Sequence, residues 1–299
     1  MGKIHYAKLP TEQPNPRSRA IDLLSIEKIL ALMNREDERV PKAVRQVKRN
    51  IASGVRLMVR SLKQGGKVYL TGAGTSGRFA VMEAAECPPT FSTPPSLVQA
   101  VMAGGRRAVF RSQEGAEDRK SEAIKIFRKK LSPPDLLIGI SASGVTPFVE
   151  GALRAARQKK VKTILIAANA KPSCRKFTDC LIAPNVGPEI ISGSTRLKAG
   201  TATKLILNML TVTTMIQMGK VYHNWMVDLQ PKSKKLTARA VRIIEHLGQV
   251  STSEARRYLK QARGNVKTAI LMARKKLSCR RAKKILNQHS GFLRKALEP

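Results

Sequence analysis

Small and hydroxyl-bearing residues between positions 72 and 77 form a candidate anion-binding site. They follow an apolar run at 68–70 that predicts a buried strand. A helix is predicted from 79 to 85, and Pro88 and Pro89 should end it because proline has no N–H to donate. A strand, a glycine loop and a helix in this order direct free backbone N–H groups toward an anion, usually a phosphate. The predicted phosphate ligands are Gly74, Thr75, Ser76 and Gly77.

The same loop also fits the G-x-G-x-x-G pattern of dinucleotide-binding proteins. That function requires an acidic residue about 20 positions later to hold the ribose, and no Asp or Glu occurs from 87 to 113. The hydroxyl groups in the loop suit a phosphate monoester instead. A tight turn with a purely structural role is the alternative, since short glycine motifs also arise by chance.

A second loop of small residues repeats the pattern further along the chain. It runs from 141 to 147, between an apolar strand predicted at 136–140 and a helix predicted at 148–159. Its candidate phosphate ligands are Ser141, Ser143, Gly144 and Thr146, with local capping as the structural alternative for each hydroxyl. In an α/β protein both loops lie beyond the carboxyl ends of parallel strands, where ligands bind. Two such loops favour a sugar-phosphate site.

The remaining pattern predicts an α/β fold, a parallel sheet with helices on both faces. Further strands are predicted at 97–102, 163–168 and 180–183, and helices at 41–63, 114–130 and 205–218. Beyond 231 the pattern is helical, and Ser251 with Glu254 fits a capping box. The predicted organisation is an N-terminal arm with a first helix (1–40), a sugar-phosphate-binding domain (41–230) and a small, basic, all-α domain (231–299).

The formal net charge of +36 is extreme for a chain of 299 residues. Residues 231–299 contain 19 Lys and Arg but only 3 acidic residues, so this part is the most basic. Such a surface binds polyanions non-specifically, although the 4% aromatic content provides few platforms for stacking bases. The four cysteines lack metal-site spacing, the first residues lack a signal-peptide core, and no apolar run reaches 18 residues. A cytoplasmic protein without a membrane span is expected.

Several longer motifs carry a resemblance to a known family. They are GAGTSGR at 72–78, AECPPT at 85–90, EGAED at 114–118, SASGVTP at 141–147, GKVYHNWMVD at 219–228 and NQHSGF at 287–292. Together they resemble the N-acetylmuramic acid 6-phosphate etherases, which contain a sugar isomerase (SIS) domain. The stretch GPEIISGSTRLKAGTATK at 187–204 also resembles a signature of glucokinase regulatory protein. The resemblance implies a flavodoxin-like SIS fold and a C-terminal domain similar to ubiquitin-associated (UBA) domains.

The resemblance also implies a reaction, cleavage of the D-lactyl ether of N-acetylmuramate 6-phosphate. A base removes the C2 proton of the ring-opened sugar, an acid protonates the ether oxygen, and water adds to the unsaturated intermediate. By the family's motifs Glu86 is the acid and Glu117 the base, while Lys198 and Glu189 are candidate contacts to the substrate. A homodimer that requires no metal or organic cofactor is implied as well.

Each of these residues also has a structural alternative. Glu86 near a predicted helix end opposes the helix dipole, which favours a functional role, whereas Glu117 also fits an ordinary first-turn carboxylate. A lysine such as Lys198 is more often a solvated surface charge. For the whole chain, the alternatives are a non-catalytic phosphosugar sensor resembling glucokinase regulatory protein and, on charge alone, a nucleic-acid-binding protein. In the segment 11–15 Pro14 departs from the family pattern, so a substrate contact from this arm is not implied.

Overall fold

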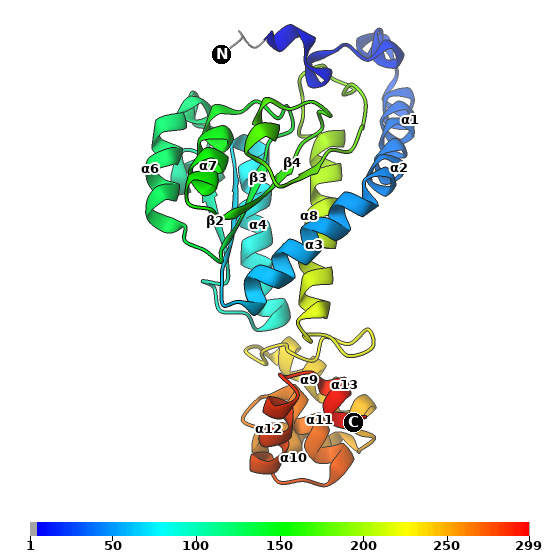
Figure 1. Ribbon diagram of the computed structural model, residues 1–299. Helices are drawn as coiled ribbons and strands as arrows, with labels where there is room; N and C mark the ends of the chain where they lie inside the picture. The colour runs from blue at the N-terminus through cyan, green and yellow to red at the C-terminus, as the bar shows by residue number, and fades with distance from the viewer. Residues whose placement is uncertain (1–4, 299) are drawn as a thin grey trace. The chain divides into compact units, whose positions relative to one another are not determined.

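The computed structural model describes residues 5–298, which divide into two compact units (Figure 1). The first, here called the sheet unit, holds the described residues up to 84 together with 96–211. The second, the C-terminal unit, holds 85–95 and 212 onward. The two long helices α4 (Gly74–Phe91) and α8 (Lys198–Gln217) each contribute to both units. The predicted boundaries at 40/41 and 230/231 stay predictions.

The sheet unit contains five parallel strands in the order β2-β1-β3-β4-β5, as the sequence pattern predicts. The strands are β1 (Val68–Gly72), β2 (Val98–Met102), β3 (Leu136–Ile140), β4 (Lys162–Ile166) and β5 (Cys180–Ile182). In register, Gly72 pairs with Met102 on one side and with Ile140 on the other. The carboxyl ends of β1, β2 and β3 therefore lie level with one another.

Helices cover both faces of the sheet, which confirms the predicted fold class (Figure 1). On one face Tyr69, Leu137 and Leu165 join a buried cluster with apolar residues of α6 (Lys120–Lys130) and α7 (Pro147–Gln158). The other face packs against α3 (Lys48–Lys63). A Cβ built at Gly54 of α3 would lie within 3.4 Å of Ile164, Ile182 and Leu210, so α3 packs closely on β4, β5 and α8.

The remaining elements of the sheet unit are short. They are η1 (Tyr6–Lys8), η2 (Pro10–Glu12), η3 (Pro16–Ser18), η4 (Ile21–Leu23), α1 (Ile26–Asp37), α2 (Arg39–Gln46), α5 (Gly105–Phe110), η5 (Ala116–Asp118) and η6 (Ser173–Phe177). The helix predicted at 41–63 is in fact α2 and α3, because Val47 leaves the helical conformation.

Helix α4 differs from the prediction at both ends. It begins at Gly74, so Thr75, Ser76 and Gly77 belong to its first turn and not to a loop. It also continues through Pro88 and Pro89 to Phe91, and the N–H of Ser92 donates to the Pro88 carbonyl at 3.0 Å. Proline's fixed φ is itself helical, so the helix loses two hydrogen bonds and still continues. Glu86 therefore lies before the last turn, and its predicted conflict with the dipole is wrong.

Two other helix starts were also predicted wrongly. The helix predicted from 114 begins at Lys120, because Gly115 has a φ of 71° and only the single turn η5 follows it. Glu117 is therefore not in the first turn of an α-helix. The helix predicted from 205 begins at Lys198, since the polar residues before 205 continue the helix on the amino-terminal side of its apolar part.

The C-terminal unit is a helical bundle with its own core. Its helices are α9 (Lys234–Gly248), α10 (Thr252–Gln261), α11 (Val266–Lys275), α12 (Cys279–Gln288) and α13 (Leu293–Leu297). The capping box predicted for Ser251 and Glu254 is confirmed at the start of α10. The core includes Ile244, Leu259 and Ile270, each buried. No helix among residues 5–298 is both long and apolar enough to span a membrane.

Candidate functional site

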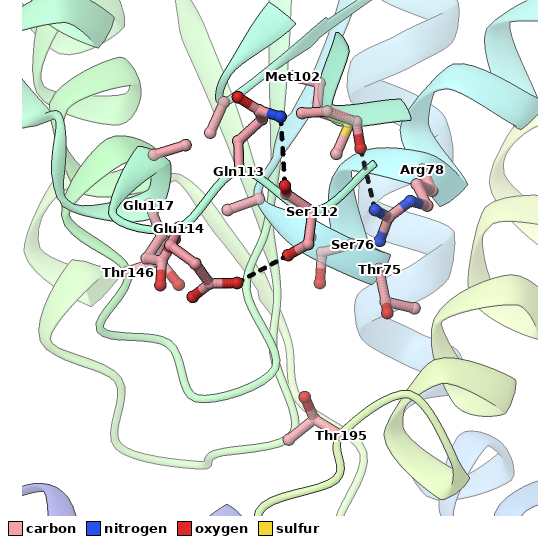
Figure 2. A pocket seen from close by; sticks show the side chains of 15 residues that line it. Thr75, Ser76, Arg78, Met102, Ser112, Gln113, Glu114, Glu117, Thr146 and Thr195 are labelled. Atoms are coloured by element: carbon pink, nitrogen blue, oxygen red, sulfur yellow. Dashed lines mark hydrogen bonds between the residues drawn. The ribbon is translucent and has the colours of Figure 1, made fainter. Parts of the chain in front are cut away.

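A cavity of about 270 Å³ lies at the carboxyl ends of β1 and β2. Its walls come from the first turn of α4, the segment 102–117 and the loop that follows β3. Thr195, on the loop before α8, completes the lining (Figure 2). The lining residues are Ala73, Gly74, Thr75, Ser76, Arg78, Met102, Ala103, Ala108, Ser112, Gln113, Glu114, Ala116, Glu117, Thr146 and Thr195. This is the edge of the sheet where the sequence predicts a phosphate site.

The α4 wall of the cavity is suited to an anion. Gly74, Thr75 and Ser76 occupy the first three positions of a helix of 18 residues, where backbone N–H groups have no intrahelical partner. Among the described residues the Thr75 and Ser76 hydroxyls form no hydrogen bond, and Figure 2 shows both at the cavity. These three predicted ligands therefore lie at the amino-terminal, positive end of the α4 helix dipole.

Gly77, the fourth predicted ligand, does not line the cavity. Its N–H donates to the Ala73 carbonyl at 3.2 Å. A Cβ at this position would lie 2.5 Å from Met102 Cγ and 2.8 Å from the Gly72 carbonyl oxygen. The absence of a side chain thus lets the first turn of α4 sit directly on β1, which positions Thr75 and Ser76.

We expect Gly77→Ala to reduce both stability and the affinity of the cavity for a phosphate ester. The added methyl group has no room against the backbone of Gly72, so the helix start must shift, at a cost of about 1–3 kcal/mol. Urea unfolding followed by circular dichroism measures the stability, and the Kd of a phosphate ester measures the displacement of the hydroxyls. Wild-type values of both quantities would contradict the close packing.

In the loop after β3, only Thr146 of the four predicted ligands lines the cavity. Ser141 is buried, and its Oγ lies 2.7 Å from Thr146 Oγ1 and accepts the Gly144 N–H at 3.0 Å. Ser143 Oγ accepts the Val145 N–H at 3.4 Å. Gly144 has a φ of 72° and packs on Pro172. Ser141, Ser143 and Gly144 therefore shape the loop that presents Thr146.

Two carboxylates face this cavity from the segment before α6. Glu117 lies on η5, and Glu114 precedes Gly115 and accepts a hydrogen bond from Ser112 Oγ at 3.0 Å. Both side chains are exposed to solvent, and Figure 2 shows them with Thr146 across the cavity from Thr75 and Ser76. A substrate held by its phosphate at α4 would thus have a carboxylate within the same cavity.

Arg78 is the one cationic residue in the lining. Its Nε donates to the Val109 carbonyl at 2.9 Å and its Nη2 to the Ala108 carbonyl at 3.0 Å. These bonds tie α5 to α4 and use two of the five guanidinium N–H groups. The others remain for an anion, so Arg78 both holds the wall of the cavity and offsets its negative charge.

Glu86, the predicted acid, is exposed on α4 and does not line the cavity. It belongs to the segment 85–95 of the C-terminal unit. The neighbouring Glu83 is buried and has a structural role, because it binds Lys204 Nζ at 2.8 Å and Thr211 Oγ1 at 2.5 Å. The cavity thus brings Glu117 together with four of the eight predicted phosphate ligands, Gly74, Thr75, Ser76 and Thr146, but not with Glu86.

Lys198 and Glu189 are also outside the lining, in a buried polar cluster. Glu189 accepts the N–H groups of Lys198 and Ala199, both at 2.9 Å, and so caps α8. Burial raises the pKa of Glu189, while these hydrogen bonds oppose the shift. The Nζ of Lys198 lies 2.5 Å from an oxygen of Glu36. Lys198 is 1% exposed, so it is neither a solvated surface charge nor a group at the cavity.

Glu36 is the centre of this cluster. Its two carboxylate oxygens accept hydrogen bonds from Asn15, Arg17 and Lys198. Burial alone would raise the pKa of Glu36, but the hydrogen bonds from Arg17, Lys198 and Asn15 together outweigh it and lower the pKa to about 2. Asn15 also donates to the Pro188 carbonyl at 3.2 Å. The N-terminal arm is therefore fastened to the segment before α8.

Sequence reasoning missed five polar residues that line the cavity, namely Arg78, Ser112, Gln113, Glu114 and Thr195. Thr195 lies in the stretch 187–204 singled out from the sequence, but there the charged residues were favoured over the hydroxyls. Arg78 belongs to the GAGTSGR motif. Its side chain reaches the cavity because the helix begins at Gly74 and not at 79.

Comparison with other proteins identifies the family of this chain. An N-acetylmuramic acid 6-phosphate etherase of Clostridium acetobutylicum is 44% identical over 295 residues, which cover 98% of both chains. The chain belongs to the N-acetylmuramic acid 6-phosphate etherase family. The etherase of Geobacillus thermodenitrificans is 45% identical over 97% of this chain and 99% of its own length. N-acetylmuramic acid 6-phosphate etherase 2 of Vibrio cholerae is 44% identical over 97% of this chain and 95% of its own length.

The sheet unit of this etherase-family chain has the SIS fold. Residues 121–213 match the SIS domain, and residues 50–157 match the N-terminal SIS domain of glucokinase regulatory protein. A phosphoheptose isomerase from Francisella tularensis superposes with a TM-score of 0.51 at 20% identity, covering 65% of this chain and 99% of the isomerase. At that identity the likeness concerns the fold alone.

Proposed function

We propose that this protein cleaves the D-lactyl ether of N-acetylmuramate 6-phosphate to give N-acetylglucosamine 6-phosphate and D-lactate. The observation that carries the proposal is a sequence identity of 44% and 45%, over nearly the whole length, with proteins named for this activity. The cavity at the sheet edge has the required elements, a helix N-terminus with free hydroxyls for a phosphate and a carboxylate opposite. The enzyme is thus a carbon–oxygen lyase.

In this proposal the cavity residues have separate tasks. Thr75, Ser76 and Thr146, with the N–H groups at the start of α4, hold the phosphate. Glu117 removes the C2 proton of the ring-opened sugar, because a carboxylate held beside a carbon acid acts as a general base. Loss of lactate then follows with proton donation to the ether oxygen, and water adds to the double bond.

Glu86 is proposed as the proton donor on its motif alone, since it does not line the cavity. Besides Glu117, the carboxyl group that the cavity offers is that of Glu114. Lys198 and Glu189 contribute by holding the start of α8, next to the loop on which Thr195 lines the cavity. These are positioning roles, since both side chains are committed to protein partners. The cytoplasmic location expected from the sequence is part of the proposal.

A homodimer is part of the proposal as well. Helix α8 exposes Met209, Val212 and Ile216 on one stripe, spaced three and four residues apart, each between 42% and 44% exposed. A stripe of that spacing is the pattern by which one helix packs on another. A second copy of the chain is the occupant expected from the family resemblance.

The test is D-lactate release from N-acetylmuramate 6-phosphate by the purified chain, detected with a lactate dehydrogenase assay. We expect stoichiometric lactate and N-acetylglucosamine 6-phosphate. The same assay on N-acetylmuramate, which lacks the phosphate, should give little product because the α4 site is then empty. A folded protein that binds the phosphosugar without releasing lactate would favour instead a regulator like glucokinase regulatory protein.

A further inference from the structure

The C-terminal unit contains a second cavity, which the proposed activity does not use. Its volume is about 420 Å³, and it lies between the segment 224–226 and α9. Four of its seven lining residues are apolar or aromatic, two are arginines and one is an asparagine. The lining consists of Asn224, Trp225, Met226, Ala238, Arg239, Arg242 and Ile243. No carboxylate is among these residues, so an entering anion would meet only positive charge.

The charge around this cavity is not neutralised within the protein. Between 231 and 298 the ion pairs of the described residues engage only Arg257, Lys267 and Arg294, out of 19 Lys and Arg. Arg239 and Arg242 are both exposed and lie one turn apart on α9. Arginines without an acidic partner can neutralise the phosphates of a nucleic acid and so release the counterions condensed on it, which favours binding of a polyanion.

Aromatic rings in this unit are consistently paired with cations. From 212 onward the chain has four aromatic residues, and each has a Lys or Arg over its ring. At the cavity, Arg242 Cζ lies 5.9 Å from the Trp225 ring centroid, and the His246 ring lies 5.0 Å away. A ring beside a guanidinium is the arrangement that single-stranded nucleic acids recognise, because bases stack on the ring while arginine contacts the phosphate.

The backbone at 222–225 supports a site at this position. His223 has a φ of 50°, a conformation that favours glycine, and its Nδ1 lies 3.3 Å from Nη2 of Arg294. Tyr222 and Trp225 are joined by backbone hydrogen bonds of 3.2 and 2.9 Å, which form a tight bridge. The bridge fixes the backbone from which the Trp225 ring projects, and that ring lies 5.0 Å from the His246 ring of α9.

We propose that the C-terminal unit binds single-stranded nucleic acid, with a base on Trp225 and the adjoining phosphates on Arg239 and Arg242. Recognition is by stacking and charge, without base-specific hydrogen bonds, so it is tolerant of sequence. Duplexes bind more weakly, because their bases are not available to the indole. This activity is separate from the proposed lyase reaction and does not depend on it.

The experiment uses the full chain and a 12-nucleotide oligo(dT), with two readouts. Trp225 is the only tryptophan in the sequence, so quenching of its emission reports on this cavity alone. Anisotropy of labelled oligo(dT) gives the affinity and its dependence on salt. We expect quenching by oligo(dT) but not by inorganic polyphosphate of equal charge. Equal quenching by both, or none by oligo(dT), would overturn the proposal.

Matched variants distinguish binding at this cavity from binding by the positive charge of the whole C-terminal unit. The salt dependence is measured as the slope of the logarithm of the binding constant against the logarithm of the salt concentration. Arg239→Ser/Arg242→Ser should reduce the size of this slope by about 1.4, since each phosphate contact on a single strand contributes about 0.7. Trp225→Leu keeps an apolar side chain and should lower the affinity for oligo(dT) about ten-fold, because the stacking ring is lost. The control is Arg280→Ser/Arg281→Ser on α12, with the same loss of charge from exposed positions. If this control weakens binding as much as the α9 pair, general charge alone binds the strand and the cavity is not the site.

Discussion

Glu117→Gln is expected to lower D-lactate release by a factor of about 10²–10⁴, the usual contribution of a positioned general base. The amide keeps the size and the position of the side chain on η5 but cannot accept the C2 proton. In deuterated water, therefore, the variant should also fail to place deuterium at C2 of the sugar. Product analysis by mass spectrometry and NMR measures both effects on one sample.

Two other carboxamide variants make this result specific. Glu114→Gln changes the second carboxylate of the same cavity and serves as the matched control. Glu86→Gln should lose lactate release yet still exchange the C2 proton, because an acid is needed only when the ether bond breaks. If Glu114→Gln shows that pattern in place of Glu86→Gln, the proton donor is Glu114. Exchange that survives in Glu117→Gln would remove Glu117 as the base.

Glu36→Gln is expected to destabilise the sheet unit by about 3–5 kcal/mol, because it leaves the ammonium group of Lys198 buried without a counter-charge. Urea unfolding monitored by circular dichroism measures this loss; Trp225 fluorescence would not, since that residue lies in the C-terminal unit. The double variant Glu36→Leu/Lys198→Met removes both charges and should recover part of the stability. A double variant no better than Glu36→Gln would show that the loss arises from Asn15 and Arg17.

The same cluster predicts how stability varies with acid pH. The pKa of Glu36 is about 2 in the folded protein, below its ordinary value of 4.5. The carboxylate therefore contributes stability that is fully present above pH 4.5 and is lost as the pH falls toward 2, about 3 kcal/mol in all. In Glu36→Gln this part of the acid dependence should disappear. Parallel pH profiles for the two proteins would contradict the assigned cause.

The sheet was predictable from the sequence because its strands are short apolar runs buried on both faces, and such runs alternate with helices. The helix ends were less so. Pro88 and Pro89 are strong breakers by themselves, yet packing along the rest of α4 keeps the helix intact through them. At Gly115 the error was the opposite, a helix predicted too long. The left-handed conformation of Gly115 prevents a helix from starting at 114, although the composition of 114–130 suits one.

Within the candidate site, residue type predicted some of the cavity-lining residues that come shortly after a strand, and it failed for residues whose place depends on long-range contacts. Thr75 and Ser76 follow β1 directly, and Thr146 follows β3, so their place at the sheet edge is local. Lys198 looked like a surface cation because its partner, Glu36, is 162 residues earlier in the sequence. Arg78 was missed because its side chain contacts the carbonyls of α5, 30 and 31 residues later.

The pairing of Glu36 with Lys198 has a consequence for synthesis on the ribosome. A ribosome adds about 5–20 residues per second, so the 162 residues between the partners take on the order of 10–30 seconds to make. During that interval Asn15, Arg17 and Glu36 are already part of the chain, while Lys198 has not yet been joined to it. The N-terminal arm is therefore the earliest part translated and among the last to reach its final position.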